Sequence, residues 1–309
     1  MRHIFVVNPA AGKKDRTEQL TKEIERVTKQ ENIKATIHIT TGVGDAKAFA
    51  AECGRKSAGE EIFIYACGGD GTLGQVVSGA AHYPNMRVGV IPIGTGNDFI
   101  RNFTNTDQFM NLTSQLYATP TPMDLLHWND DYCVNMINTG FDCEVVAKVA
   151  EIKRKPWVPS RLAYIIGLIM VLSKMPGVSL KLSMSNEPAE EKELLLCTIA
   201  NGQYCGGGFR SNPKASICDG LLDACAIQYI KRGKFLSLVG KYKKGTHLEA
   251  KGASEIIGYR QGKRIDLFFE KEQNICVDGD IAVVKELHVE AVPKGFQFLL
   301  PQGCSLIQR

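Results

Sequence analysis

Residues 62–72 read Ile62-Phe63-Ile64-Tyr65-Ala66-Cys67-Gly68-Gly69-Asp70-Gly71-Thr72, an apolar run followed directly by a glycine-rich loop. A short apolar run bounded by glycines is typical of a buried strand. Glycines at a strand end let backbone amides approach an anionic ligand, because no Cβ stands in the way. A helix that starts after such a loop adds positive partial charge for a phosphate. The stretch therefore predicts a strand, a phosphate-binding loop and a helix.

A second loop of this kind reads Gly94-Thr95-Gly96-Asn97-Asp98-Phe99 and follows the apolar run 88–92. Two glycine-rich turns could simply cap two strands, which is the alternative reading. Ligands of parallel sheets bind at the carboxyl ends of the strands, however, where both loops would lie. Asp70 and Asp98 would then hold Mg²⁺ on a phosphate. Together the loops predict a phosphotransferase that uses a nucleotide.

The chain changes character near residues 119–122, Thr-Pro-Thr-Pro. Before this point apolar strands alternate with helical stretches, which predicts βαβ units and a parallel sheet. After it most segments read as strands, with two helices at about 142–153 and 160–174, so the second domain is expected to be an all-β sandwich or barrel. We predict an α/β domain formed by residues 1–125 plus 293–309, and a sandwich domain formed by residues 126–292.

Composition restricts the class of protein. A net charge of +4 over 309 residues is too weak to indicate a nucleic-acid partner. The ten cysteines form no C-x-x-C pair, as expected in a reducing cytoplasm. No signal peptide is expected, and the apolar run 162–172 is short of the roughly 20 residues that span a bilayer. Basic clusters near residues 13–16, 153–155, 231–234 and 241–244 could contact an anionic membrane peripherally, or could be solvated faces.

Five motifs together carry a family resemblance. They are Asn8-Pro9-Ala10-Ala11-Gly12, the loops at 68–72 and 94–99, the stretch from Pro213 to Asp219-Gly220-Leu221-Leu222-Asp223, and Val277-Asp278-Gly279-Asp280. With them the chain resembles the diacylglycerol kinase and sphingosine kinase superfamily, in its bacterial lipid kinase branch, over about residues 3–300. The glycine-aspartate loop alone is also similar to motifs of NAD kinases.

The resemblance implies an NAD-kinase-like α/β domain, a β-sandwich domain, and ATP bound in the cleft between them. It also implies a structural Mg²⁺ held by the Asp219 carboxylate with the carbonyls of Ser216 and Leu221. Adding the second loop, the expected nucleotide contacts are Asn8, Pro9, Ala10, Ala11, Gly12, Thr40 (or Thr41), Gly68, Gly69, Asp70, Gly71, Thr72, Leu73, Gly74, Thr95, Gly96, Asn97 and Asp98.

The general base of the family lies in an Asp-Gly-Glu sequence, which here reads Asp278-Gly279-Asp280. The expected catalytic residues are therefore Asp280 or Asp278, with Asp70 at the metal and phosphates. The helix after the first loop commonly carries Asn-Glu in the family, whereas this chain has Gly74-Gln75.

Three functions stay open at this point. The first is an ATP-dependent lipid kinase of phospholipid metabolism, cytoplasmic and peripheral at the inner membrane face, which phosphorylates the hydroxyl of a lipid such as diacylglycerol. The second is a kinase with a soluble substrate such as NAD. The third is a lipid- or nucleotide-binding regulator that has lost catalysis. Residues 161–175 are the candidate lipid-facing element or a core helix, residues 204–209 a loop at the cleft mouth, and a homodimer is left open.

Overall fold

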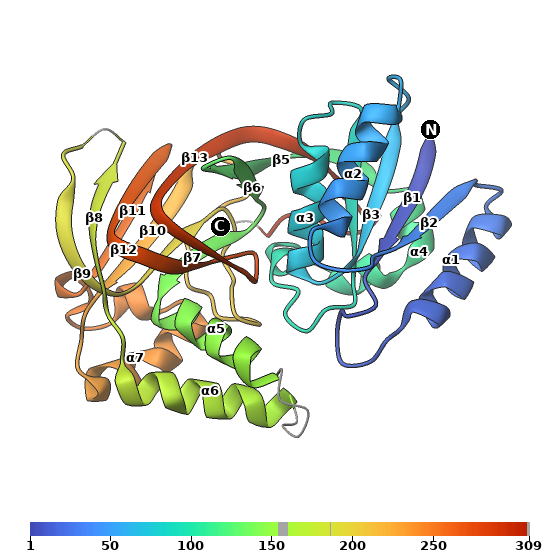
Figure 1. The fold of residues 1–309 in the computed structure, drawn as a ribbon. Helices are drawn as coiled ribbons and strands as arrows, with labels where there is room; N and C mark the ends of the chain where they lie inside the picture. Colours follow the sequence, from blue (N-terminus) through green and yellow to red (C-terminus); the bar gives the residue numbers. More distant parts are fainter. Residues whose placement is uncertain (154–159, 186, 308–309) are drawn as a thin grey trace.

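A computed structural model describes residues 1–153, 160–185 and 187–307. The N-terminal part alternates strands and helices along the chain, as the two glycine loops predict (Figure 1). Its elements are β1 (Arg2–Val7), α1 (Thr17–Gln30), β2 (Ala35–Ile39), α2 (Asp45–Lys56), β3 (Ile62–Gly68), α3 (Asp70–Ala80), β4 (Met86–Pro92), the 3₁₀ turns η1 (Phe99–Asn102) and η2 (Thr106–Met110), and α4 (Leu112–Leu116).

The strands of this part pair in parallel in the order β4-β3-β1-β2. Alternate residues of each strand point to opposite faces of the sheet. Ile4, Val6 and Ile64 pack with the apolar sides of α2 and α3, whereas Phe5 and Tyr65 pack with α1 and α4 on the other face. The carboxyl ends of β1, β3 and β4 are thus left at one edge, where the loops emerge.

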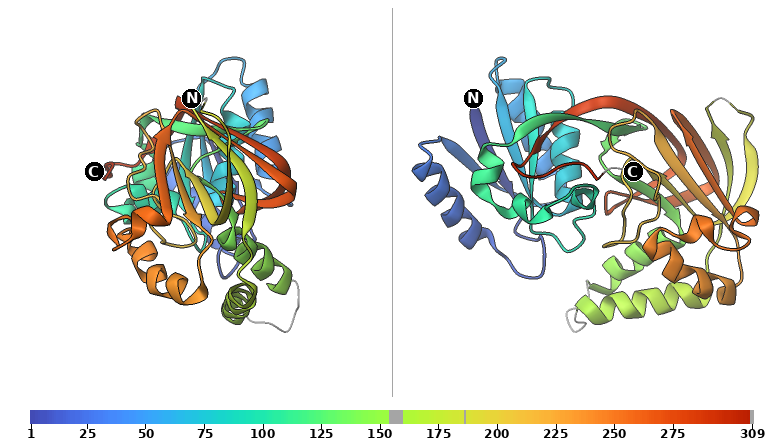
Figure 2. Two further views of the ribbon diagram at one scale, coloured as in Figure 1. Left: turned by 90° about the vertical axis from the view of Figure 1, so that its left-hand side faces the viewer. Right: turned by 180° about the vertical axis from the view of Figure 1, so that it is seen from behind.

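The C-terminal part is rich in strands but also contains three helices in its described residues. Its elements are β5 (Thr119–Trp128), β6 (Asp131–Cys133), β7 (Met136–Gly140), α5 (Phe141–Lys153), α6 (Ser160–Lys174), β8 (Val178–Met184), β9 (Glu190–Ala200), β10 (Leu222–Gln228), α7 (Arg232–Lys244), η3 (His247–Glu249), η4 (Ala253–Glu255), β11 (Ile257–Gly262), β12 (Arg264–Val277) and β13 (Asp280–Leu300). The expected strands are present, and two of the helices are those predicted at about 142–153 and 160–174. Helix α7 was not predicted, and with α5 and α6 it covers one end of the strands, so this part is not all-β (Figures 1 and 2).

The long strand β13 connects the two parts (Figure 1). It pairs with β12 over its first half and with β5 over its second half, and Gln297 and Phe298 pair in parallel with Arg87 and Val88 of β4. The strands of the described chain consequently belong to one hydrogen-bonded network. The domain boundary near residue 125 stays a prediction, since β5 and β13 run across it without a break.

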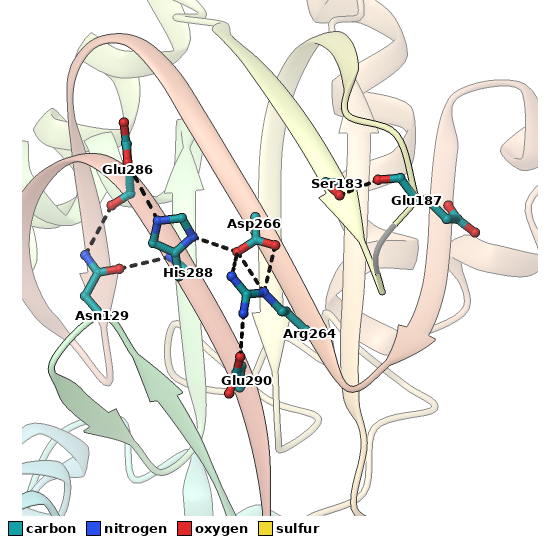
Figure 3. A network of polar contacts seen from close by, with 8 residues as sticks. All are labelled: Asn129, Ser183, Glu187, Arg264, Asp266, Glu286, His288 and Glu290. Carbon is teal, nitrogen blue, oxygen red and sulfur yellow. Dashed lines mark hydrogen bonds and ion pairs between the residues drawn. The ribbon is translucent and has the colours of Figure 1, made fainter.

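Strands β12 and β13 have one apolar and one polar face. Ile265 and Leu267 of β12 lie in the core of this part, as do their cross-strand partners Val289 and Leu287. On the opposite face Asp266 accepts from the Arg264 guanidinium and lies 2.6 Å from Nδ1 of His288 (Figure 3). Asn129 joins this network through its side chain, which also holds the turn after β5 against β13.

Candidate active site

The two glycine loops lie back to back at the carboxyl ends of β3 and β4. The amide of Gly94 donates to the carbonyl of Gly68 at 3.1 Å. A Cβ placed on Gly94 would lie 2.4 Å from the Cα of Gly69, so no side chain fits there. The close approach explains why glycine is required at the point where the loops cross, and it brings the two loop aspartates together.

The carboxylates of Asp70 and Asp98 both lie close to Gly96. A Cβ on Gly96 would lie 3.2 Å from Oδ2 of Asp70 and 3.4 Å from Oδ2 of Asp98. Asp70 accepts from the Phe99 amide at 3.0 Å, while Asp98 accepts from Nε of Arg101 at 3.1 Å and from the Gly207 amide at 2.8 Å.

Burial raises the pKa of both Asp70 and Asp98 above the ordinary value, and the charge of Asp70 raises the pKa of Asp98 further. Two neighbouring carboxylates that resist ionisation together are stabilised by a divalent cation between them, and their oxygens are the ligands that Mg²⁺ prefers. The chemistry of this pair thus fits the Mg²⁺ that the sequence predicted.

The first loop of the chain joins the same edge. Asn8 donates from its side chain to the Thr72 hydroxyl at 2.9 Å, and its own Oδ1 accepts from the Ala10 amide. Gly12 adopts φ +82° and a Cβ there would lie 2.4 Å from the Ile93 carbonyl oxygen. Asn8 therefore ties residues 8–12 to the start of α3, next to the loop after β4.

The other predicted nucleotide contacts differ in the exposure and the hydrogen bonds of their side chains. Thr95 is exposed and faces the cavity described below. Leu73 is buried in the core, and Asn97 donates to the Pro92 and Gly94 carbonyls, so these side chains shape the loops. The Thr41 hydroxyl donates to Asp45, whereas Thr40 is half-buried at the end of β2, its amide donating to the Val7 carbonyl. The geometry favours Thr40 over Thr41 as the residue that faces the edge.

The two candidate bases differ sharply in environment. Asp278 is buried and its carboxylate accepts from the backbone amides of Val134, Asn135 and Met136, at 2.7, 2.9 and 3.0 Å, and from the Cys133 thiol. Burial raises the pKa of Asp278 to about 6. Asp280 is exposed, and its Oδ2 accepts from the side-chain amide of Gln75 at 3.1 Å.

Gly74 and Gln75 acquire roles that the sequence did not reveal. A Cβ on Gly74 would lie 2.9 Å from Oδ2 of Asp278, so glycine at this position lets the buried carboxylate approach α3. Gln75 accepts from the Gly44 amide at 3.2 Å while donating to Asp280. Gln75, which stands where the family commonly has Glu, therefore links the N-terminal part of the chain to Asp280 of the C-terminal part.

The predicted metal residues lie on one loop before β10. Asp219 is exposed and accepts from the Leu221 amide at 3.1 Å, and Ser216 is half-buried. Sequence reasoning missed Asp124, which is buried beneath this loop and accepts from the amides of Gly220 and Lys294 at 2.6 and 2.7 Å. One exposed carboxylate beside backbone carbonyls is an oxygen-only donor set, which suits a hydrated Mg²⁺.

A cavity of about 510 Å³ extends from the glycine loops into the C-terminal part. Gly69, Asp70, Gly96, Asp98 and Asp280 line one end. The other end is an apolar chamber lined from α5, α6, α7 and the strands β9 to β11 by Phe141, Val145, Val146, Leu172, Leu196, Ile227, Phe235, Leu236, Leu238, Val239 and Ile257.

Two elements named from the sequence contribute to this cavity. Cys205, Gly206, Gly207 and Phe209 of the expected cleft loop line it, and Leu172 lines it from α6. The basic stretch at 153–155 lies mostly outside the described residues. Helix α7 was missed by sequence reasoning, although Phe235, Leu238, Val239 and Tyr242 follow the helical spacing i, i+3, i+4, i+7 that could have found it.

Comparison with known proteins gives two adjoining family matches. Residues 2–128 match the diacylglycerol kinase catalytic domain, and residues 135–300 match the YegS C-terminal NAD kinase beta sandwich-like domain. A protein of Stenotrophomonas maltophilia named "Probable lipid kinase YegS-like" is 28% identical, with 90% of each chain covered. The diacylglycerol kinase of Bacillus subtilis is 26% identical over 89% of this chain and 88% of its own.

A solved structure has the same overall fold. The crystal structure of a diacylglycerol kinase from Bacillus anthracis superimposes with a TM-score of 0.67 and 21% identity, covering 97% of both chains. At this identity the likeness concerns the arrangement of both parts of the chain and not the details of the site.

Proposed function

Because the chain belongs to the lipid kinase family in which a diacylglycerol kinase catalytic domain precedes a YegS-type C-terminal domain, we propose that it transfers the γ-phosphate of ATP to a lipid hydroxyl, such as that of diacylglycerol. The observation that carries the proposal is the single cavity that joins the glycine-aspartate loops to an apolar chamber. A lipid tail in the chamber would place its hydroxyl at the loops.

Phosphoryl transfer requires positioning and charge neutralisation more than covalent chemistry by the protein. The loops at residues 8–12, 68–72 and 94–96 would surround the phosphates of ATP. Asp70 and Asp98 would hold Mg²⁺, which when bound neutralises phosphate charge. Arg101, whose guanidinium lies at Asp98, adds a fixed positive charge at the same end.

Asp280 is the proposed general base. It lines the cavity at the phosphate end, and it is exposed enough to take the proton of an acceptor hydroxyl. The amide of Gln75 orients its carboxylate. Asp278 is assigned a structural role, because it is buried and three backbone amides and a thiol already donate to its carboxylate. The Mg²⁺ proposed at Asp219 would likewise brace the loop before β10.

Contact with an anionic membrane surface is part of the proposal. Leu236 of α7 lines the cavity and is 56% exposed, and Ile169 and Met170 of α6 are exposed as well. Lys231, Arg232 and Lys234 precede Leu236 in the sequence, and Arg232 donates to the Ser173 carbonyl at the end of α6. An anionic membrane attracts each such charge by about 1 kcal/mol. Among the described helices none is long and apolar enough to cross a bilayer.

The experiment compares acceptors under one set of conditions. Purified protein is incubated with γ-labelled ATP, Mg²⁺ and mixed micelles of diacylglycerol, beside NAD and beside no acceptor. The proposal expects label in an organic-extractable phospholipid. Labelled NADP would instead favour a kinase of soluble substrates, and nucleotide binding without transfer to any acceptor would favour a regulator that has lost catalysis.

A further inference from the structure

One acidic residue of the cavity has no part in the phosphate chemistry. The acidic side chains that line the cavity are Asp70, Asp98, Asp142, Asp278 and Asp280. Asp70 and Asp98 are the proposed metal ligands, and Asp280 is the proposed base. Asp278 anchors the backbone of residues 133–136. Asp142, the second residue of α5, lines the same cavity but has no such function.

The contacts of Asp142 leave hydrogen-bonding capacity unused. Its Oδ1 accepts from the Cys143 amide at 2.9 Å, and its Oδ2 accepts from the Asn138 side-chain amide at 2.7 Å. Each carboxylate oxygen can accept two hydrogen bonds, so these two donors and the residue's own backbone amide leave part of this capacity for a ligand. Both donors are neutral, and Asp142 forms no ion pair with the cations in the described part of the chain.

The surroundings of Asp142 favour a ligand that donates a hydrogen bond to its carboxylate. Phe141, Val145, Cys205 and Cys276 line the wall around it. Burial raises the pKa of the Asp142 carboxyl to about 7, although the Cys143 and Asn138 donors oppose the shift. A buried carboxylate without a charged partner is costly, and a ligand that donates to it removes part of that cost.

Two further polar atoms of the chamber lack partners. The Tyr242 hydroxyl and Nδ1 of His247 have no hydrogen bond, although Tyr242 is 9% and His247 only 1% exposed. Both side chains line the cavity, with their rings 4.9 Å apart. Ser211 is their polar neighbour: its backbone lies near His247, and its hydroxyl, near Tyr242, is already paired with the sulfurs of Met136 and Cys205. The chamber is therefore equipped for a ligand with more polar groups than the phosphorylated hydroxyl.

We propose that Asp142 and Asn138 form a polar subsite that accepts a second hydrogen-bond donor of the lipid, a hydroxyl or an amine close to the phosphorylated hydroxyl. This inference rests on the proposed function and narrows its substrate class. A lipid with a second free donor is preferred over diacylglycerol, whose other two oxygens are esterified and cannot donate. Tyr242 and His247 pair with a polar group further along the same lipid.

The test compares three lipids with acyl or alkyl chains of equal length: a monoacylglycerol, a long-chain amino alcohol and a diacylglycerol. For each, kcat and KM are measured in wild type, in Asp142→Asn and in the control Glu144→Gln. Asparagine at 142 keeps an acceptor for the Cys143 amide, so α5 retains its start. Glu144 lies two residues further along the helix, accepts from the Asn274 side chain, and does not line the cavity.

Asp142→Asn is expected to lower kcat/KM for the donor-bearing lipid roughly tenfold to a hundredfold relative to diacylglycerol, mainly through KM, since a bond to a charged group is lost. Whichever of the two donor-bearing lipids shows the larger loss identifies the hydroxyl or the amine as the partner. Glu144→Gln should leave the ratio unchanged.

An unchanged ratio in Asp142→Asn, with lipids still phosphorylated, overturns the subsite and leaves the proposed function standing. Failure of wild type to phosphorylate any lipid overturns both. Asn138→Ala provides a second variant if Asp142→Asn melts early. It removes the amide that orients Asp142, and it should lower the same ratio in the same direction.

Discussion

Asp278 and Asp280 are two residues apart and have separate tasks. Positive φ values at Asp278 and Gly279 turn the chain sharply between them. Asp278 faces the backbone of residues 133–136, and Asp280 faces Gln75. The sequence could narrow the base to these two carboxylates, but it could not choose, because the choice depends on amides more than a hundred residues away.

Asp280→Asn is expected to lower turnover by about 10²–10⁴, the usual contribution of a general base, with little change in ATP affinity. Asp280→Glu should be tolerated, because it restores the residue common in the family. Asp278→Asn should lower the melting temperature, since the carboxylate of Asp278 accepts four hydrogen bonds from residues 133–136. Steady-state kinetics and thermal melts separate the two effects. A silent Asp280→Asn beside a folded but inactive Asp278→Asn would reverse the assignment.

At the scale of elements, the sequence predicted the loops well and the chamber poorly. The loops are encoded locally, by glycines directly after apolar strands. Helices α5 and α6 were also predicted, within a few residues of their observed bounds. Helix α7 was missed because the basic residues at 231–234 and 241–244 were interpreted as two charge clusters, although apolar residues recur at helical spacing between them. The chamber depends on how three helices and several strands meet, which no local pattern contains.

Gly94→Ala is expected to reduce ATP binding and stability together, because the added methyl group would meet the Cα of Gly69 at 2.4 Å. Backbone on both sides leaves no flexible group to move aside. Gly42→Ala is the matched control, since its Cβ would have no neighbour within 4 Å. Nucleotide titration and thermal melts report both effects. Normal ATP affinity in Gly94→Ala would show that the crossing of the loops does not shape the nucleotide site.

At the scale of the whole molecule, the site forms where the two parts of the chain meet. Asp131, the first residue of β6, contacts Lys47 of α2 and Ser78 of α3, and Gln75 donates to Asp280. The sequence predicted an α/β domain, a strand-rich domain and a cleft between them. It could not predict that β5 and β13 continue the sheet from one part to the other, because strand pairing over such separations is not visible in local patterns.

The charge of α7 yields a prediction for membrane contact. Changing Lys231, Arg232 and Lys234 to Glu should weaken binding to vesicles that contain anionic phospholipid, and the loss should diminish at high salt. The same change at Lys22, Arg26 and Lys29 of α1, which are equally exposed, is the control. Vesicle sedimentation measures both variants. Equal binding by the two variants would place the membrane-facing surface elsewhere.

In the proposed function one cavity serves both the phosphates and the lipid tail, and the substitution Val239→Trp tests this shared cavity. Val239 lines the chamber from α7 and is half-buried, whereas Ser237 on the same helix is exposed and does not line it. The indole should fill the chamber without reaching the glycine loops. We expect Val239→Trp to keep its ATP affinity but to lose at least about tenfold in lipid kcat/KM, and Ser237→Trp to keep both. Lipid phosphorylation at the wild-type rate by folded Val239→Trp would show that the lipid tail does not bind in this chamber.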